Sequence, residues 1–281
     1  MRIITLTTDF GTRDWFVGTM KGVVLGINPR AVIMDITHAI PPADIRAGAF
    51  SLMAACRYFP RGSVHLAVVD PGVGSGRRAI AVQTANYVFV GPDNGVLSWA
   101  LAREQIKSIR QLENPRYFLK ECSRTFHGRD IFAPVAAYLS RGLQWRQLGR
   151  ELKDHVRLPW REPKQTGDGI LGEIVHIDRF GNAITNIGTG LVPAGRKVTC
   201  EVMGQRKMRC SRAAFYAAVP AGSPVAVAGS TGFLEVAVNG GSAAQKFGLA
   251  IGNRVRARII KADKGQPARA GRPKRIVNFR N

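Results

Sequence analysis

The first half of the chain alternates short runs of β-branched residues with longer segments of helical periodicity, and this alternation constrains the fold more than any other feature. It is typical of βαβ units, in which helices connect the strands and cover both faces of one sheet. We therefore expect an N-terminal Rossmann-like α/β domain. The expected strands are 3–7, 32–36, 64–69, 79–84 and 87–90, and the expected helices are about 15–26, 44–58, 95–103 and 131–141.

A segment rich in proline, glycine and charge at 155–169 is the best candidate for a linker. Beyond it the pattern changes to strands and turns without long helical periodicity, which predicts a small C-terminal β-barrel domain. The predicted division is 1–160 for the α/β domain, 161–262 for the β-barrel domain and 263–281 for a disordered basic tail. The strands expected in the barrel are 172–177, 197–203, 224–228, 233–238 and 254–260.

The formal net charge of +22 is extreme for an enzyme that acts on small molecules. A basic surface attracts polyanions, so a non-catalytic nucleic-acid-binding protein is one alternative. Seven of the 41 basic residues lie between Lys261 and Arg280, beside a single acid, so the tail is a candidate for binding polyanions. The chain shows no zinc-finger spacing, RNP-like aromatic run or helix-turn-helix signal, and we do not expect it to recognise a specific nucleic acid.

Cysteine usage and hydropathy indicate the compartment. The four cysteines form no CxxC pair and show no metal-ligand spacing, which favours buried, reduced thiols. No His/Cys/Asp cluster has the spacing of metal ligands, and we expect neither a metal nor another cofactor. The N-terminal apolar stretch is too short for a signal peptide, and no apolar run is long enough to span a bilayer. We expect a cytoplasmic protein that does not associate with membranes.

A glycine-rich turn follows the apolar strand expected at 64–69, and it carries Asp70 at its start and Arg77 at its end. Three glycines within five residues let the backbone approach a ligand closely. Asp70 and Arg77 can then meet across the turn, either as part of a site or as a surface ion pair of little energetic consequence. His127, just before the helix expected at 131–141, is the most suitable third member of this set, although a histidine at such a turn is often structural.

Three acids, Asp9, Asp35 and Asp70, fall at the carboxyl ends of expected strands, where ligands bind in sheets of this kind. A carboxylate at Asp9 can accept two hydrogen bonds from the vicinal hydroxyls of a ribose. The alternative is that Asp9 or Asp14 caps the helix expected from Trp15. No G-x-G-x-x-G sequence follows the strand, so the ordinary dinucleotide fingerprint is absent.

Further polar positions lie near expected turns and strands. Asp130 is expected to cap the helix at 131–141. Asp178 and Asn182 flank a glycine turn, where they serve a ligand or form an Asx turn. Glu235 interrupts an apolar strand, where it serves a ligand or faces solvent by simple alternation.

Five motifs, taken together and in order, resemble the S-adenosylmethionine (SAM) hydroxide adenosyltransferase family. The resemblance runs from residue 3 to about 260 and implies an α/β domain followed by a β-barrel, hydrolysis of SAM to adenosine and L-methionine, and trimers with active sites between subunits. The motifs are Thr8-Asp9-Phe10-Gly11, Asp70-Pro71-Gly72-Val73-Gly74 with Arg77, Phe126-His127-Gly128-Arg129-Asp130, Asp178 with Phe180-Gly181-Asn182, and Gly232-Phe233-Leu234-Glu235-Val236-Ala237-Val238-Asn239.

The resemblance implies a role for each matching residue. It assigns Asp70, Arg77 and His127 to the positioning and activation of water. The substrate-binding residues that it implies are Asp9 for the ribose, Asp14 and Asp178 for the methionine amino acid group, Asn182 with the backbone near Val238 for the adenine edge, Phe215 against the adenine, and Ser230 and Glu235 around the final motif.

The family is related to halogenating enzymes, so a SAM-dependent halogenase is an alternative within enzymes. In those relatives a tyrosine stands at the position of Asp70, and a serine that contacts halide can stand at the position of Gly128. Their absence here favours hydroxide over halide as the nucleophile. Thr231 stands where the fluorinating relative carries an arginine, so the partner of the methionine carboxylate is left open.

Overall fold

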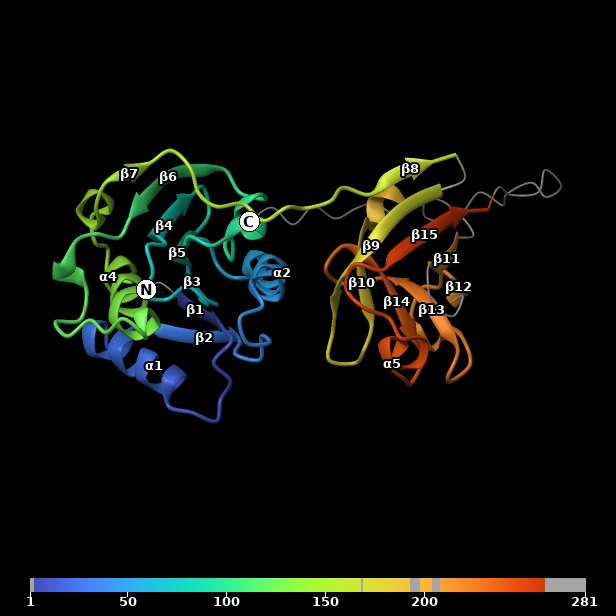
Figure 1. Cartoon of the computed structure of the whole chain (residues 1–281), viewed down its shortest axis with the longest axis horizontal. Coiled ribbons are helices and arrows are strands. Elements are labelled where there is room, and N and C mark those ends of the chain that lie inside the picture. Colours follow the sequence, from blue (N-terminus) through green and yellow to red (C-terminus); the bar gives the residue numbers. More distant parts are fainter. Residues whose placement is uncertain (1–2, 168, 193–197, 204–207, 261–281) are drawn as a thin grey trace. The chain divides into compact units, whose positions relative to one another are not determined.

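The computed structural model describes residues 3–167, 169–192, 198–203 and 208–260. Contacts divide the chain into two units, Met1–Trp160 and Arg161–Asn281. The first is an α/β unit and the second is built almost wholly from strands (Figure 1), as the sequence predicts. The predicted tail at 263–281 lies outside the described residues.

The first unit contains a seven-stranded mixed sheet in the order β2-β1-β3-β5-β4-β6-β7. Strands β1, β2, β3 and β5 pair in parallel, while β4, β6 and β7 add an antiparallel edge. The bounds are β1 Ile3–Thr8, β2 Val32–Thr37, β3 Val64–Val68, β4 Ala79–Thr84, β5 Val88–Pro92, β6 Ile106–Gln111 and β7 Glu151–Leu152.

Strand β2 pairs with one edge of β1, and the chain then crosses over so that β3 pairs with the other edge of β1. The carboxyl ends of β1 and β3 therefore form a topological switch point, where connections diverge and leave a crevice for a ligand. Asp9 follows β1 and Asp70 lies two residues beyond β3, so both stand at this point. Asp35 does not, because β2 continues past it to Thr37 and its carboxylate pairs with Lys21 and His38.

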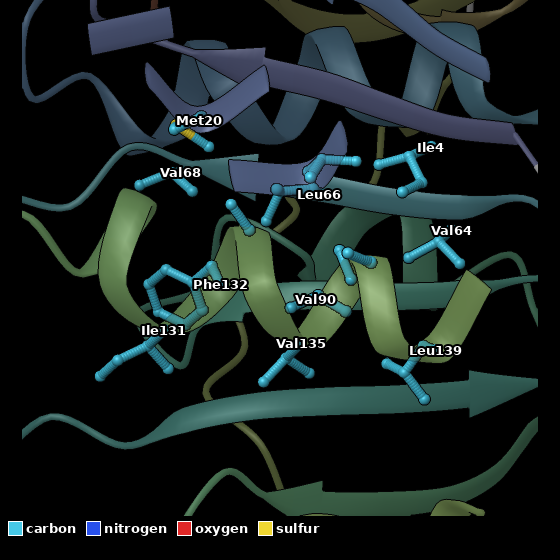
Figure 2. Close-up of a cluster of buried hydrophobic side chains, with 14 of the residues drawn as sticks. Ile4, Met20, Val64, Leu66, Val68, Val90, Ile131, Phe132, Val135 and Leu139 are labelled. Atoms are coloured by element: carbon cyan, nitrogen blue, oxygen red, sulfur yellow. The ribbon is translucent and has the colours of Figure 1, made fainter. Parts of the chain in front are cut away.

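Helices cover the sheet on both faces, with α1 (Phe16–Ile27) and α4 (Ala133–Ser140) on one side and α2 (Ile45–Ala55) on the other (Figure 1). Alternate residues of β1 and β3 point towards α1 and α4 and form one hydrophobic cluster with them. Figure 2 shows part of this cluster, including Leu66, Phe132 and Leu139. The core thus fixes the strand ends that carry Asp9 and Asp70.

Two expected helices differ from the structure. The helix expected at 95–103 is reduced to α3 (Ser98–Leu101), which follows Gly95 at a φ of 99°. The helix expected at 131–141 begins earlier, because a π-helical segment at Gly128–Phe132 precedes α4. Strands β6 and β7 were not predicted, since their mixed polar sequences lack a clear apolar run.

The second unit contains an eight-stranded antiparallel sheet that is almost barrel-shaped, in the order β12-β11-β15-β9-β10-β14-β13 with β8 paired to β9. Strand β9 is long enough to pair with β15 and β8 over its first part and with β10 over its last. The bounds are β8 Lys164–Thr166, β9 Gly169–Ile177, β10 Ala183–Gly188, β11 Val198–Val202, β12 Met208–Ser211, β13 Pro224–Ala228, β14 Phe233–Val238 and β15 Arg254–Ile259, with one short helix, α5 Ala243–Phe247.

The cysteines are free, but they are not all buried. Cys122 is exposed, which corrects the expectation of four buried thiols. Cys200 and Cys210 are buried and lie directly opposite each other on β11 and β12. No helix among the described residues is long and apolar enough to cross a bilayer.

His65 on β3 is a buried titratable group inside the first unit. Its Nδ1 lies 2.7 Å from the Thr5 hydroxyl, and aromatic rings including those of Tyr87 and Phe89 surround it. Burial lowers the pKa of His65 to about 4. The folded protein therefore keeps this side chain neutral at pH values where the unfolded chain binds a proton.

We expect this difference to make the protein less stable as pH falls from about 6.5 to about 4, by up to about 3 kcal/mol, while stability is retained above that window. Urea unfolding at several pH values measures it. The His65→Gln variant should show a flatter pH profile than the natural protein, whereas His155→Gln should not. Equal profiles for His65→Gln and the natural protein would contradict the assignment.

Candidate active site

Asp70 and Arg77 form a bidentate ion pair across the glycine-rich turn, as the sequence predicts. The Arg77 Nε donates to both carboxylate oxygens, at 2.9 and 3.0 Å, and Nη2 also donates to Oδ2. The side chains are only 11% and 5% exposed for Arg77 and Asp70 respectively, so this is not a surface pair. The guanidinium also lies 5.2 Å from the ring centroid of Phe132. A buried pair held by several hydrogen bonds has a fixed geometry.

His127 joins this pair, because its Nδ1 lies 2.8 Å from Nη2 of Arg77. Arginine has only donors, so Nδ1 must be the acceptor and carries no proton. In neutral His127 the proton is therefore on Nε2. Burial lowers the pKa of His127, and the positive charge of Arg77 lowers it further, against the opposing effect of Asp70. The imidazole is thus held neutral, with an N–H donor at Nε2.

Close contact between two backbone segments sets the spacing of these three side chains. Gly74 has a φ of 77°, a region that favours glycine, and a Cβ added there would lie within 2.3 Å of the carbonyl oxygen of Arg124. The turn that carries Arg77 therefore packs directly against the segment that leads to His127. Any other residue at position 74 would separate the two segments.

A pocket of about 170 Å³ opens beside Asp70 and His127. Its walls are mostly apolar and include Phe10, Phe16 and Phe126, whose rings pack together at centroid distances of 5.2–5.8 Å. The polar groups that line it thus stand beside mostly apolar walls. Within the described ranges, no group of three or more His, Cys, Asp or Glu side chains could hold a metal ion.

Asp9 lies at the end of β1 with one carboxylate oxygen already engaged. Its Oδ2 accepts a hydrogen bond of 2.8 Å from the backbone amide of Ala43, which has a φ of 63°. The second oxygen, Oδ1, remains available to a ligand. The alternative that Asp9 or the exposed Asp14 caps helix α1 is wrong. The N-cap residue of α1 is Trp15, and no side chain makes a capping hydrogen bond there.

Asp130 is also not a helix cap. It lies inside the π-helical segment, is fully buried, and pairs with Arg129 at 2.6 Å while accepting from the Ser123 amide at 2.8 Å. The preference of aspartate for helix starts identified the right segment, but the helix begins earlier than its sequence indicates.

In the second unit, Asp178 and Asn182 form a closed polar turn after β9. Asp178 Oδ1 accepts from the amides of Phe180 and Asn182, each at 2.9 Å, and Oδ2 accepts from the Asn182 side chain at 2.9 Å. The predicted Asx turn is therefore present. Asn182 uses one of its two side-chain N–H groups on Asp178, so its side-chain oxygen and the other N–H are the groups it can offer to a ligand.

Glu235 is buried, so the alternative that it faces solvent is wrong. Its Oε2 accepts a hydrogen bond of 2.7 Å from the Tyr216 hydroxyl. Burial raises the pKa of Glu235, the charge of Asp178 raises it further, and the Tyr216 hydrogen bond opposes this rise. Gly229 leaves the space for this carboxylate, since a Cβ there would lie within 1.9 Å of Oε1.

The remaining candidates of the second unit are Phe215, Val238 and Ser230. Phe215 immediately precedes Tyr216 and is 60% exposed, while Val238 is buried at the end of β14. Ser230 is exposed in the turn between β13 and β14. Next to it, the Thr231 hydroxyl is buried without a hydrogen-bond partner among the described residues.

Sequence reasoning missed Tyr216, Ala43 and the contact at Gly74. Tyr216 is adjacent to Phe215, but the sequence does not show that its hydroxyl reaches Glu235, nineteen residues away. Ala43 has no polar side chain and acts through its amide. Nothing in the local sequence could have indicated either contact.

The chain matches family models in both units. A model of the SAM hydroxide adenosyltransferase N-terminal domain matches residues 4–149, and a model of the C-terminal domain of the same family matches residues 172–256.

Individual relatives agree with these matches. Over 263 residues the chain is 41% identical to an (R)-S-adenosyl-L-methionine hydrolase of Thermus thermophilus, covering 91% of this chain and 99% of the relative. A crystal structure of an uncharacterized conserved protein from Thermotoga maritima superimposes with a TM-score of 0.85 at 38% identity, covering 91% and 99% of the two chains. A fluorinase of Nocardia brasiliensis is more distant, at 27% identity over 290 residues, covering 92% and 97%.

The contact between Arg77 and His127 predicts that the pKa of His127 depends on the charge of Arg77. We expect His127 to titrate below 6.5, and its pKa to rise in Arg77→Met, because that variant removes the positive charge and leaves Asp70. NMR of the imidazole carbon protons over a pH series measures both values. Arg78→Met is the matched control, since Arg78 pairs instead with Asp93 and Asp154. A His127 pKa that is unchanged in Arg77→Met would contradict the contact.

Proposed function

The chain belongs to the SAM hydroxide adenosyltransferase family, and we propose that it hydrolyses S-adenosyl-L-methionine to adenosine and L-methionine by attack of water at C5′. It is an enzyme of the SAM hydrolase type. The observation that carries the proposed mechanism is the Asp70, Arg77 and His127 cluster beside an apolar pocket.

The substrate determines what the enzyme must supply. The sulfonium of SAM leaves as a neutral thioether, so no acid is needed at sulfur and no cofactor is required. The difficult step is to make water nucleophilic at C5′, which calls for a proton acceptor and for a positive charge beside the forming hydroxide. The three clustered side chains supply these groups.

Arg77 stays protonated and cannot act as the base. Its guanidinium can stabilise the hydroxide that forms beside it, an interaction that grows towards the transition state. The bidentate bond to Asp70 and the bond to His127 hold the guanidinium in one orientation. Arg77 therefore acts without reorganising during the reaction.

The geometry favours Asp70 over His127 as the proton acceptor. The Nδ1 of His127 is occupied by Arg77, and its Nε2 carries a proton. Asp70 Oδ1 accepts one hydrogen bond from Arg77 and retains a lone pair for water. His127 then orients the water by donating from Nε2, and Asp70 removes its proton.

The apolar pocket favours the reaction for an electrostatic reason. Hydroxide and sulfonium lose their opposite charges as the new C5′–O bond forms, so surroundings that solvate the separated ions poorly lower the barrier. The phenylalanine walls beside Asp70 and His127 provide such surroundings.

The other site residues are part of the proposal. Asp9 binds the ribose hydroxyls through its open Oδ1, held in place by the Ala43 amide. Asp14 and Asp178 lie near the methionine group. Asn182, the backbone at Val238 and the exposed ring of Phe215 contact adenine, and Ser230 and Glu235 complete that part of the site.

Gly128 supports water rather than halide as the nucleophile. A Cβ at this position would lie 3.2 Å from the ring of Phe126, 3.3 Å from Met20 Sδ and 3.4 Å from the ring of Phe10. A halide-contacting serine would therefore require its neighbours to move. The fluorinase relative is also more distant than the hydrolase relative.

A homotrimer in the cytoplasm is part of this proposal. The residues proposed for the reacting atoms belong to the first unit and those proposed for adenine to the second, and the family resemblance implies that neighbouring subunits supply them. The free cysteines fit a reducing compartment.

Labelled water tests the reaction itself. We expect oxygen from H₂¹⁸O at the 5′ position of the adenosine formed from SAM, because attack at C5′ leaves methionine intact. Mass analysis of both products measures it. Unlabelled adenosine, S-adenosylhomocysteine, or a 5′-halo product made in the presence of chloride or fluoride would each overturn the assignment.

Variants at Arg77 test the mechanism. We expect Arg77→Ala to lower kcat by about 10²- to 10³-fold with a much smaller change in KM, because its charge acts on a species formed only on the way to the transition state. Arg77→Lys should restore little, since an ammonium lacks the planar fork. Arg78→Ala, at the next position, should keep near-native kcat. If Arg77→Ala keeps near-native kcat and merely melts earlier, the ion pair is structural.

A further inference from the structure

A cluster of five basic side chains lies on one outer face of the second unit, which is formed by strands β8, β9, β15, β11 and β12, with the basic residues on β8, β15 and β12. Three of them, Arg254, Arg256 and Arg258, alternate along β15 with the buried Val255 and Ala257. Residues two apart on a strand share a face, so the three arginines point away from the core. We call this surface the basic face. Its basic residues are Lys164, Arg209, Arg254, Arg256 and Arg258.

The strand register places these residues side by side. Arg256 lies opposite Leu171 of β9 on one side and Glu201 of β11 on the other. Lys164 then pairs with Leu171, and Arg209 with Glu201. Directly paired residues on neighbouring strands project from the same face. One row thus crosses all five strands, over about 19 Å at the usual strand spacing.

The next row is flat and polar. Arg258 lies between Gly169 of β9 and Thr199 of β11, and Ser211 of β12 follows. The side chain of Arg258 is 40% exposed beside these small residues, and hydroxyl groups are common contacts of phosphate oxygens. No aromatic side chain belongs to these rows, so the described part of the face has no platform on which unpaired bases could stack.

The acids on the face do not balance its positive charge. Glu173 already pairs with Arg161, at 3.1 Å. Glu201 lies 4.0 Å from both Arg209 and Arg258 and serves the two together. Arg254 and Arg256 make no ion pair with any residue in the described ranges. Like charges at about 6.6 Å spacing along β15 repel one another, and a polyanion would remove that cost.

We infer that the basic face binds the phosphate backbone of double-stranded nucleic acid without sequence preference. Arginine forks match phosphate geometry, and a duplex offers one negative charge per about 1.7 Å of its axis. The lack of aromatic residues on the face favours a duplex over a single strand. The basic residues of the face lie on β8, β12 and β15. Asp178 follows the far end of β9, Ser230 lies between β13 and β14, and Glu235 lies on β14, so binding at the face does not use the residues proposed for SAM.

Salt dependence of binding is the quantity that tests this inference. With four to five phosphates engaged, the affinity of the natural full-length chain for a fluorescein-labelled DNA duplex of mixed sequence should fall at least about 10²-fold between about 50 and 200 mM salt. Fluorescence anisotropy measures it. The slope of the logarithm of the binding constant against the logarithm of the salt concentration is the value to compare. In the Arg254→Gln/Arg256→Gln/Arg258→Gln variant this slope should decrease in magnitude by about one unit for each arginine removed.

A matched control separates the face from the overall charge. The Lys107→Gln/Arg116→Gln/Arg146→Gln variant removes the same charge from exposed positions of the first unit and should keep the slope of the natural chain. In a further variant, all basic residues from Lys261 to Arg280 are replaced by glutamine. Replacing the three β15 arginines in that background should lower the salt slope by the same amount as in the natural chain. Hydrolysis of SAM and a thermal melt report whether each variant is folded. The single Arg256→Gln variant replaces the triple one if the latter melts early, with an expected loss of about one unit of slope.

Four outcomes would overturn the inference. These are an equal loss of slope in the first-unit control, complete loss of binding in the tail variant, tighter binding of a single-stranded oligonucleotide than of the duplex, and tighter binding of vesicles of anionic lipid than of the duplex. Failure of the SAM assay with retained duplex binding would instead count against the proposed function alone.

Discussion

The buried ion pair between Arg77 and Asp70 is the interaction on which the proposed chemistry depends. Taking two charges out of water is costly unless the geometry provides several hydrogen bonds, and here the guanidinium contacts both carboxylate oxygens and the His127 nitrogen. The rest of the first unit supplies that geometry. Strand β3 carries Asp70 to the switch point, and the helix layer packed on the sheet fixes the segment that bears His127.

The two units contribute different kinds of polar groups. In the first unit the charges are oriented by one another and by backbone amides such as that of Ala43. In the second, Asp178 and Glu235 are held by neighbouring donors in a turn and in a strand. The basic face of the second unit carries arginines that share few acids, and Arg254 and Arg256 make no ion pair within the described ranges. The same small sheet therefore presents one surface with satisfied acids and another with excess positive charge.

Much of the first unit could be predicted because its signals are local. Apolar runs identified β1, β2 and β3, and the residues that follow β1 and β3 identified Asp9 and the Asp70 to Arg77 turn. The polar strands β6 and β7 were missed because they complete the sheet by pairing rather than by burying an apolar face. The cap role expected for Asp130 was wrong, Tyr216 was missed, and the sequence left the burial of Glu235 open. The reason is related, since burial and contacts between distant segments decide the roles of these residues.

The contact between Gly74 and the carbonyl of Arg124 has a consequence for how this part of the molecule can vary. Two loops that meet backbone to backbone cannot change length independently, because a residue inserted in one would push the other aside. The distance from Arg77 to His127 is thus encoded in the lengths of two loops as well as in three side chains. A homologue could keep all three side chains and still lose the arrangement through a single insertion.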